Sequence, residues 1–164
     1  MSPPPASAGG SRAALLGIFG EPSRIPLELV ADQAGNMAYL TAVEILGRTD
    51  GGASPTVEQL SERQRTHAAL VATGGGTADA AWRFPLPEMN LAPTSDSLLA
   101  RWNAASDGQA PQRIEEHLVR RIRQWRPEVI VTEDVSPRGE NPLAYLTNQL
   151  VLAAVAKAGD ESAF

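Results

Sequence analysis

The clearest hydrophobic pattern in the chain lies between Arg113 and Ala158. One apolar stripe recurs there at helical spacing, with acidic residues in the first turn and arginines in the last; it consists of Ile114, Leu118, Ile122 and Trp125. Pro127 ends this pattern, and the β-branched run Val129–Val131 has no polar alternation, as expected for a central strand of a parallel sheet covered on both faces. Asn141 and Pro142 then provide an N-cap and a first-turn proline. The segment is therefore predicted to form a helix, a strand, a loop and a second helix.

Weaker patterns predict further elements along the rest of the chain. Strands are predicted at Ala13–Phe19, Ile25–Ala31 and Ala80–Phe84, and helices at Met37–Leu46, Thr56–Val71 and from Thr94 or Ser95 to Trp102. Met1–Arg12 is rich in Pro, Ser, Ala and Gly and is expected to be a disordered lead-in. Alternating strands and helices predict one α/β domain over residues 13–164, with a mostly parallel sheet.

Composition narrows the classes of partner. A chain of 164 residues that is 43% hydrophobic is long enough for one domain with a core. Its formal charge of −5 argues against nucleic acid, because neutralising phosphates requires a basic face. No apolar run approaches the roughly 20 residues needed to cross a bilayer, and no signal peptide is visible, so we expect a soluble chain without a membrane partner. The absence of cysteine excludes disulfides and thiolate metal ligands but leaves compartment and oligomeric state open.

The loop Thr132–Asn141 is the predicted functional surface, because parallel sheets bind ligands beyond the carboxyl ends of their strands. Asp134 and Glu140 are the candidate catalytic residues, as general base or as ligands of a metal other than zinc. The candidate ligand-binding residues in the loop are Thr132, Arg138 and Asn141. Glu133 and Asp134 are adjacent and should point to opposite sides of an extended chain, so only one of them is expected to face a ligand. The alternative interpretation is a solvated loop that caps a helix.

Two candidates lie outside this loop. Trp102 could offer a flat apolar face on which a sugar stacks. Asp32 belongs to a possible internal repeat, in which Val30–Thr41 matches Thr132–Thr147 and both segments contain Ala-Tyr-Leu-Thr. A true duplication would place Asp32 and Asp134 in equivalent loops, whereas two strand-loop-helix units of similar chemistry could also converge on this pattern.

Standard catalytic motifs are absent. The two histidines, His67 and His117, are not at metal-binding spacing and are expected on helix surfaces or at the edge of the core. No serine lies in a G-x-S-x-G motif. Gly74–Gly76 matches neither of the phosphate-binding patterns G-x-x-x-x-G-K-[ST] and G-x-G-x-x-G, so it is interpreted as a helix stop.

Over Leu118–Asp160 the sequence resembles the PIG-L or LmbE-like deacetylase family. The similarity lies in the run Leu118–Asp134, continues through Gly139 into Leu150–Ala158, and extends to the closing segment Gly159–Phe164. It implies a Rossmann-like three-layer α/β fold and, in working family members, zinc-dependent removal of acetyl groups from N-acetylglucosamine-type sugars.

The departures from that family lie in its zinc motifs. After Gly139 the family has G-H-x-D-H, whose histidine binds zinc, but this chain continues with Glu140 and Asn141. The N-terminal H-P-D-D motif is also missing, because Ala13–Phe19 leads into Gly20, Glu21 and Pro22. No metal-binding or catalytic residue of the family can be transferred, so we expect no zinc and no other cofactor.

Two explanations of these departures remain open. The chain is a non-catalytic relative that kept the scaffold, or it is part of a longer protein whose active unit lies elsewhere, which the abrupt end at Phe164 favours. The expected function is binding of a glycan-type ligand or a partner at the 132–141 loop. The alternatives are amide hydrolysis by carboxylates with a different metal, and a purely structural or assembly role.

Overall fold

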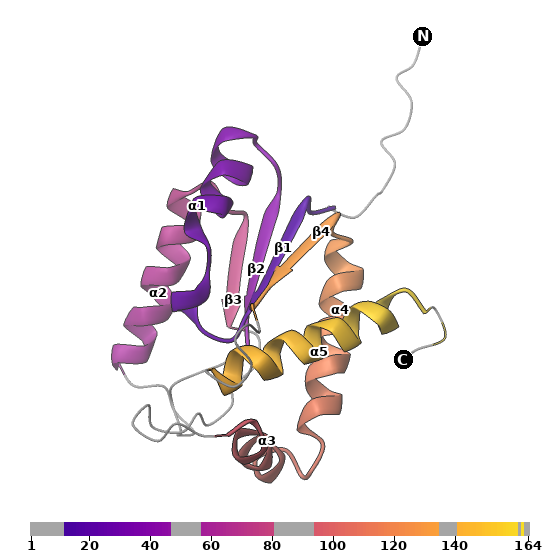
Figure 1. Ribbon diagram of the computed structural model, residues 1–164. Coiled ribbons are helices and arrows are strands. Elements are labelled where there is room, and N and C mark those ends of the chain that lie inside the picture. Colours follow the sequence, from indigo (N-terminus) through magenta and orange to yellow (C-terminus); the bar gives the residue numbers. More distant parts are fainter. Residues whose placement is uncertain (1–11, 47–56, 81–93, 135–140, 161, 163–164) are drawn as a thin grey trace.

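The computed structural model describes residues 12–46, 57–80, 94–134, 141–160 and 162 (Figure 1). Its strands are β1 (Leu15–Phe19), β2 (Thr41–Ile45), β3 (Thr77–Ala80) and β4 (Val129–Thr132). They form one sheet in the order β3-β2-β1-β4, and every pair is parallel. The protein is therefore an α/β protein with a parallel sheet, as predicted.

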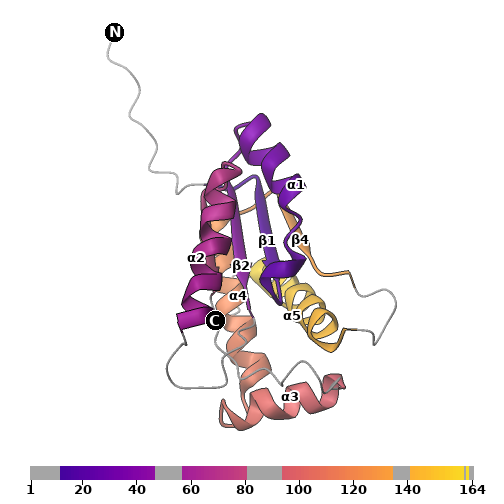
Figure 2. The same cartoon turned by 90° about the vertical axis from the view of Figure 1, so that its left-hand side faces the viewer.

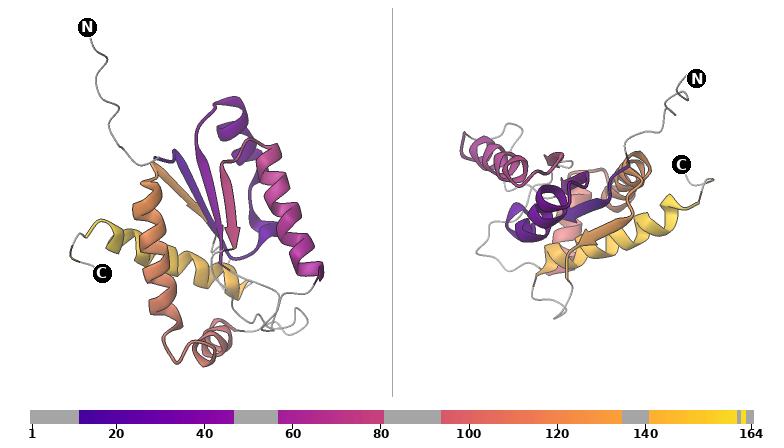
Figure 3. Two further views of the ribbon diagram at one scale, coloured as in Figure 1. Left: turned by 180° about the vertical axis from the view of Figure 1, so that it is seen from behind. Right: turned by 90° about the horizontal axis from the view of Figure 1, so that it is seen from above.

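The helices lie on both sides of this sheet. They are α1 (Leu27–Val30), α2 (Val57–Ala72), α3 (Ser95–Ala104), α4 (Ala110–Trp125) and α5 (Pro142–Ala158), with the short turns η1 (Pro22–Arg24) and η2 (Ala31–Asn36) beside α1. Seen from the front and from behind, α1 and α2 lie towards β3, and α4 and α5 lie towards β4 (Figures 1 and 3). Helix α3 lies at the end of the sheet towards which the strands run (Figures 1 and 2). None of the described helices is long and apolar enough to cross a membrane.

The strands contribute to two separate apolar clusters. Leu16 and Ile18 pack with α3, α4 and α5, in a cluster that includes the fully buried Trp102. Phe19 and Val43 belong to a second cluster with residues of α1 and α2. Alternate residues of β1 thus enter different clusters, as expected when both faces of a strand are covered.

Local capping explains the helices that the sequence predicted well. The Asn141 side chain accepts a hydrogen bond from the Ala144 amide at 2.9 Å, which caps α5 ahead of Pro142. Thr94 caps α3 by accepting from the Ser97 amide at 3.2 Å. Helix α4 ends at Trp125, and the next residue, Arg126, caps it with a left-handed φ of 45° directly before the proline.

Two predicted elements are wrong. Met37–Leu46 was expected to be a helix, but Thr41–Ile45 is the central strand β2. Ile25–Ala31 was expected to be a strand but contains α1. The third strand, β3, begins at Thr77, earlier than predicted, and residues 81–84 lie outside the described part.

The proposed internal repeat does not correspond to repeated structure. The first Ala-Tyr-Leu-Thr runs from Ala38, which has a φ of 57°, into β2, whereas the second lies within α5. The two segments therefore do not share the order of strand, loop and helix that a duplication required.

Candidate functional site

The carboxyl ends of β1 and β4 are joined by one buried side chain. The Gly20 amide, just after β1, donates a hydrogen bond of 2.8 Å to Oε1 of Glu133, just after β4. Glu133 is 5% exposed, although it follows a strand that lies at one edge of the sheet. The strand order reverses at this place: β2 and β3 lie on one side of β1, and β4, which follows β3 in the chain, lies on the other side. Ligands of open α/β sheets bind at such a reversal.

The environment of Glu133 favours its protonated form. Burial raises the pKa of this carboxyl above its ordinary value of 4.5, and the negative charge of Glu21 acts in the same direction. The Gly20 hydrogen bond and the positive charge of Arg24 oppose the shift and lower the pKa less than burial raises it. A carboxyl held in this balance keeps its proton to a higher pH than an exposed one does.

Close packing fixes the backbone on both sides of Glu133. A Cβ on Gly20 would lie 2.7 Å from Cγ of Leu143 and 3.0 Å from Oγ1 of Thr147, so the glycine lets the end of β1 approach the first turns of α5. Asn148, also on α5, donates through Nδ2 to the Glu133 carbonyl at 2.9 Å. The start of α5 therefore holds the ends of β1 and β4 together.

The loop residues selected from the sequence have differing positions. Thr132 is partly buried and donates through Oγ1 to the Ile18 carbonyl at 2.8 Å, so its hydroxyl links β4 to β1. Asn141 uses its side-chain oxygen to cap α5. Asp134 is exposed, whereas its neighbour Glu133 points inwards. Arg138 and Glu140 lie outside the described residues.

Asp32 does not join Asp134. It lies in η2, directly before β2, and accepts hydrogen bonds from the side chains of Gln33 and Asn36 at 3.1 and 3.2 Å. Gly35, in the same turn, packs on the Thr73 carbonyl shortly before β3. Asp32 is thus at the amino ends of the strands and Asp134 at the carboxyl end of β4, so these two carboxylates do not converge on one site.

Trp102 does not offer a surface for a sugar. Its side chain is fully buried in the cluster formed by α3, α4, α5 and the sheet. The expected stacking contact is therefore wrong, because the apolar face that made Trp102 a candidate is used in the core.

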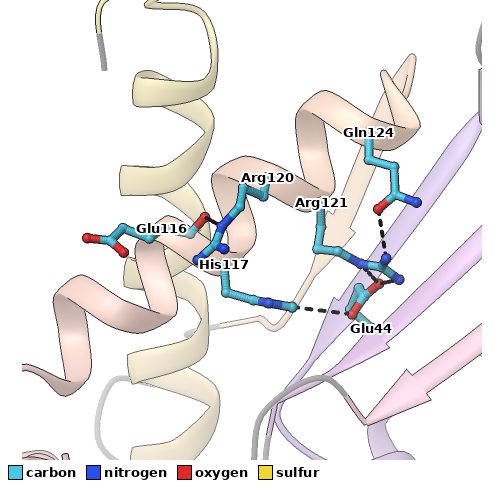
Figure 4. Close-up of polar contacts among 6 residues, drawn as sticks. All are labelled: Glu44, Glu116, His117, Arg120, Arg121 and Gln124. Carbon is cyan, nitrogen blue, oxygen red and sulfur yellow. Dashed lines mark hydrogen bonds and ion pairs between the residues drawn. The ribbon is translucent and has the colours of Figure 1, made fainter. Parts of the chain in front are cut away.

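A second buried carboxylate, Glu44 on β2, was not selected from the sequence (Figure 4). Its side chain is 1% exposed and forms an ion pair and a hydrogen bond with Arg121 of α4. Nε2 of His117 lies 3.7 Å from its other oxygen, Oε2. Arg121 also donates to Gln124 at 2.8 Å and lies 5.9 Å from the centre of the Trp125 ring. The only sequence signal was a charged residue inside the apolar run Ala42–Leu46.

These contacts give Glu44 a structural role. It tethers the sheet to α4, where the Arg121 guanidinium compensates the buried carboxylate. His117 is placed at the edge of the core, as predicted, and His67 is exposed on α2. Among the described residues no three histidine, aspartate or glutamate side chains are grouped as metal ligands.

Glu133 predicts a specific dependence of stability on pH. Because its pKa is raised by folding, its contribution is greatest below its ordinary pKa and is lost as the pH rises through the folded value. Glu133→Gln keeps an oxygen for the Gly20 amide but cannot ionise. Urea unfolding at several pH values should show the variant gaining stability relative to the parent as the pH rises from 4.5. The exposed Glu28→Gln is the control, and an equal slope in both variants would contradict the prediction.

Comparison with known proteins supports the fold only. No protein-family model matches the sequence, and no curated protein is significantly similar to it. Among the solved structures that share the fold are two longer proteins. The conserved protein TT1542 from Thermus thermophilus aligns with a TM-score of 0.62 at 20% identity, over 92% of this chain and 59% of that one. GalB, the 4-carboxy-2-hydroxymuconate hydratase from Pseudomonas putida, aligns with a TM-score of 0.61 at 15% identity, over 92% and 58%. The chain thus spans less than two thirds of each.

Proposed function

We propose that this chain is a PIG-L or LmbE-like domain that binds a glycan-type ligand without zinc-dependent catalysis. The binding site in this proposal lies at the carboxyl ends of β1 and β4. The observation that carries the proposal is Glu133, a buried carboxyl bonded to the Gly20 amide at the place where the strand order reverses. The proposal includes a Rossmann-like three-layer fold. Two separate apolar clusters support it, one with residues of α1 and α2 and the other with residues of α3, α4 and α5.

The residues at the positions of the family's zinc-binding motifs support the loss of zinc catalysis. The loop after β4 has Glu140 and Asn141 where the resembled family has a zinc-binding histidine, and no histidine follows β1. Asn141 occupies a position of the family's zinc-binding motif, and here its side chain caps α5. The substitutions thus remove nitrogen ligands that a catalytic zinc site of this type requires.

The chemistry of the site supports a ligand rich in hydroxyl and amide groups. Glu133 can accept a hydrogen bond from a hydroxyl or amide when ionised, and can donate one to a carbonyl when protonated. Sugars with an N-acetyl group present all three kinds of partner. The neighbouring Glu21 and Arg24, whose side chains lie 3.4 Å apart, add an acceptor and a donor of opposite charge.

Titration of the protein with N,N′-diacetylchitobiose, followed by amide chemical shifts, tests the proposal. We expect the Gly20 and Glu133 amides to shift, and Glu133→Gln to weaken binding about tenfold, the loss typical of one hydrogen bond to a charged group. Asp134→Asn should weaken it less, because Asp134 is exposed. Glu28→Gln should bind like the parent. Shifts confined to other regions, or none at millimolar sugar, would overturn the proposal.

The raised pKa of Glu133 favours one alternative, a hydrolase that uses this carboxyl as general base. Acetate release from the same sugar distinguishes it from binding alone. We expect no release with or without zinc, and no zinc binding near one equivalent at submicromolar affinity by calorimetry. Acetate release that is lost in Glu133→Gln would establish the hydrolase instead.

A further inference from the structure

The Glu133 side chain has one oxygen to which no described residue donates. Its Oε1 accepts the hydrogen bond of 2.8 Å from the Gly20 amide. Within the described part of the chain, no donor lies at hydrogen-bond distance from Oε2, and no cation forms an ion pair with this carboxylate. The residue is 5% exposed, so little of this oxygen's hydration remains. A buried carboxylate oxygen of this kind requires a donor to offset its desolvation.

The charged side chains beside Glu133 do not supply that donor. Glu21 and Arg24 both act on Glu133 through their charges. Nε of Arg24, however, lies 3.4 Å from the carboxylate of Glu21, so these two charges compensate each other. Ionisation of Glu133 therefore leaves an excess of negative charge among the three side chains. A cationic donor fits Oε2 better than a neutral one, because hydrogen bonds between charged groups are the stronger kind.

An ammonium group matches this single oxygen better than a metal ion does. Hard metal ions bind several oxygen ligands at once. Among the described residues, no three histidine, aspartate or glutamate side chains are grouped to provide them. An ammonium group has three N–H donors and can bond to one carboxylate oxygen. It also opposes the effect of burial on Glu133, because an adjacent cation favours the ionised form of a carboxyl.

We propose that the ligand at this site carries a primary ammonium group that donates to Oε2 of Glu133, as in an amino sugar with a free amine. This inference rests on the proposed binding of a glycan-type ligand at the ends of β1 and β4, and it specifies the ligand group that lies against Glu133. An acetylated amine has one N–H and no charge, so it forms a weaker hydrogen bond to the same oxygen. The site therefore distinguishes free amines from acetamides on the same sugar.

Three disaccharides of the same linkage test this preference in the parent protein. Chitobiose carries free amines, N,N′-diacetylchitobiose carries acetamides, and cellobiose carries hydroxyls at the same positions. At a pH at which the sugar amines are protonated, calorimetry should give chitobiose a dissociation constant about tenfold lower than that of either other sugar, the gain expected from a charged hydrogen bond over a neutral one. Chitobiose should also shift the Gly20 amide resonance, because that amide bonds the same carboxylate.

Two variants separate contact with Glu133 from the general attraction of a cation to an acidic protein. Glu133→Gln keeps an acceptor for the Gly20 amide but places an uncharged donor at the position of Oε2, so the preference for chitobiose should disappear. Glu28→Gln removes an exposed negative charge on α1 and should retain the preference. A preference that Glu133→Gln retains, or that both variants lose equally, would overturn the inference.

The sugars also distinguish failure of this inference from failure of the proposed function. If N,N′-diacetylchitobiose shifts the Gly20 and Glu133 amides but chitobiose binds no more tightly, the amine preference is wrong and the glycan site stands. If none of the three sugars binds, both are wrong. The comparison of sugars uses the parent protein, so its result holds even if Glu133→Gln does not fold.

Discussion

Truncating Trp102 to alanine is expected to lower the free energy of unfolding by about 3–5 kcal/mol, the usual loss for a buried large aromatic side chain. Trp102 has no exposed surface and packs in the cluster with Leu98, Ile114 and Leu118. Removing the indole leaves a cavity lined by α3, α4 and the sheet, which close packing on all sides prevents from collapsing fully.

Urea denaturation of the parent, Trp102→Ala and Trp102→Phe measures this effect. Phenylalanine fills part of the space, so its loss should be smaller than that of alanine and should remain measurable if the alanine variant does not fold. Val71→Ala, on an exposed side chain, should change stability by less than about 1 kcal/mol. Sugar binding by folded Trp102→Phe should match the parent, because Trp102 lies in the core. A loss near zero for both substitutions would contradict the burial of this residue.

Replacing Arg121 with alanine is the second large expected loss, about 3 kcal/mol, because it leaves the Glu44 carboxylate buried without its ion pair. This is the low end of the range for breaking a buried pair. The expected loss is at this low end because the Arg121 side chain is 19% exposed and because His117 remains 3.7 Å from Glu44 after the substitution. The loss should appear as a shift in the urea midpoint without a change in slope.

Arg120 provides a control on the next residue of the same helix. It is exposed and donates to the Glu116 carbonyl, so Arg120→Ala should cost less than about 0.5 kcal/mol. The double variant Arg121→Ala with Glu44→Leu should recover much of the stability, since it removes the uncompensated charge. If Arg120→Ala and Arg121→Ala were equally destabilising, the role assigned to the Glu44 pair would be wrong.

Elements whose signals are local were predictable. Helix α5 begins where Asn141 caps it and Pro142 follows, and α4 buries the stripe that includes Ile114 and Leu118. The β-branched run Val129–Thr132 is a strand, as its composition predicted. Its expected central position, covered on both faces, is wrong for the described sheet, because β4 lies at the edge and Val129 is 54% exposed. In each case the signal lies within a few residues of the element, so no distant contact was needed to recognise it.

The segment around β2 shows where local pattern fails. Leu40, Val43 and Leu46 fall at helical spacing, yet Thr41–Ile45 is a strand between β1 and β3. Both of its faces are buried, Ala42 against one cluster and Val43 against the other, so its hydrophobic positions do not alternate. Hydrogen bonding to two neighbouring strands decided the conformation, and neither neighbour is close in sequence.

The candidate site was also predictable only in the part that depends on local sequence. Adjacent Glu133 and Asp134 were expected to point in opposite directions, and they differ in burial accordingly. Which one points inwards depended on the end of β1 and on α5. Gly20, which donates to Glu133, lies 113 residues away in the chain.

The sequence by itself determined the α/β class, the parallel character of the sheet and the helix-strand-loop-helix order of the C-terminal segment. Periodicity, caps and prolines act over one or two helical turns and leave visible patterns. Only the tertiary structure decided that Glu133 is the buried carboxyl at the strand ends, that Glu44 pairs with Arg121, and that Asp32 lies at the opposite end of the sheet. These facts depend on desolvation and on contacts between segments far apart in the chain, which no local pattern encodes.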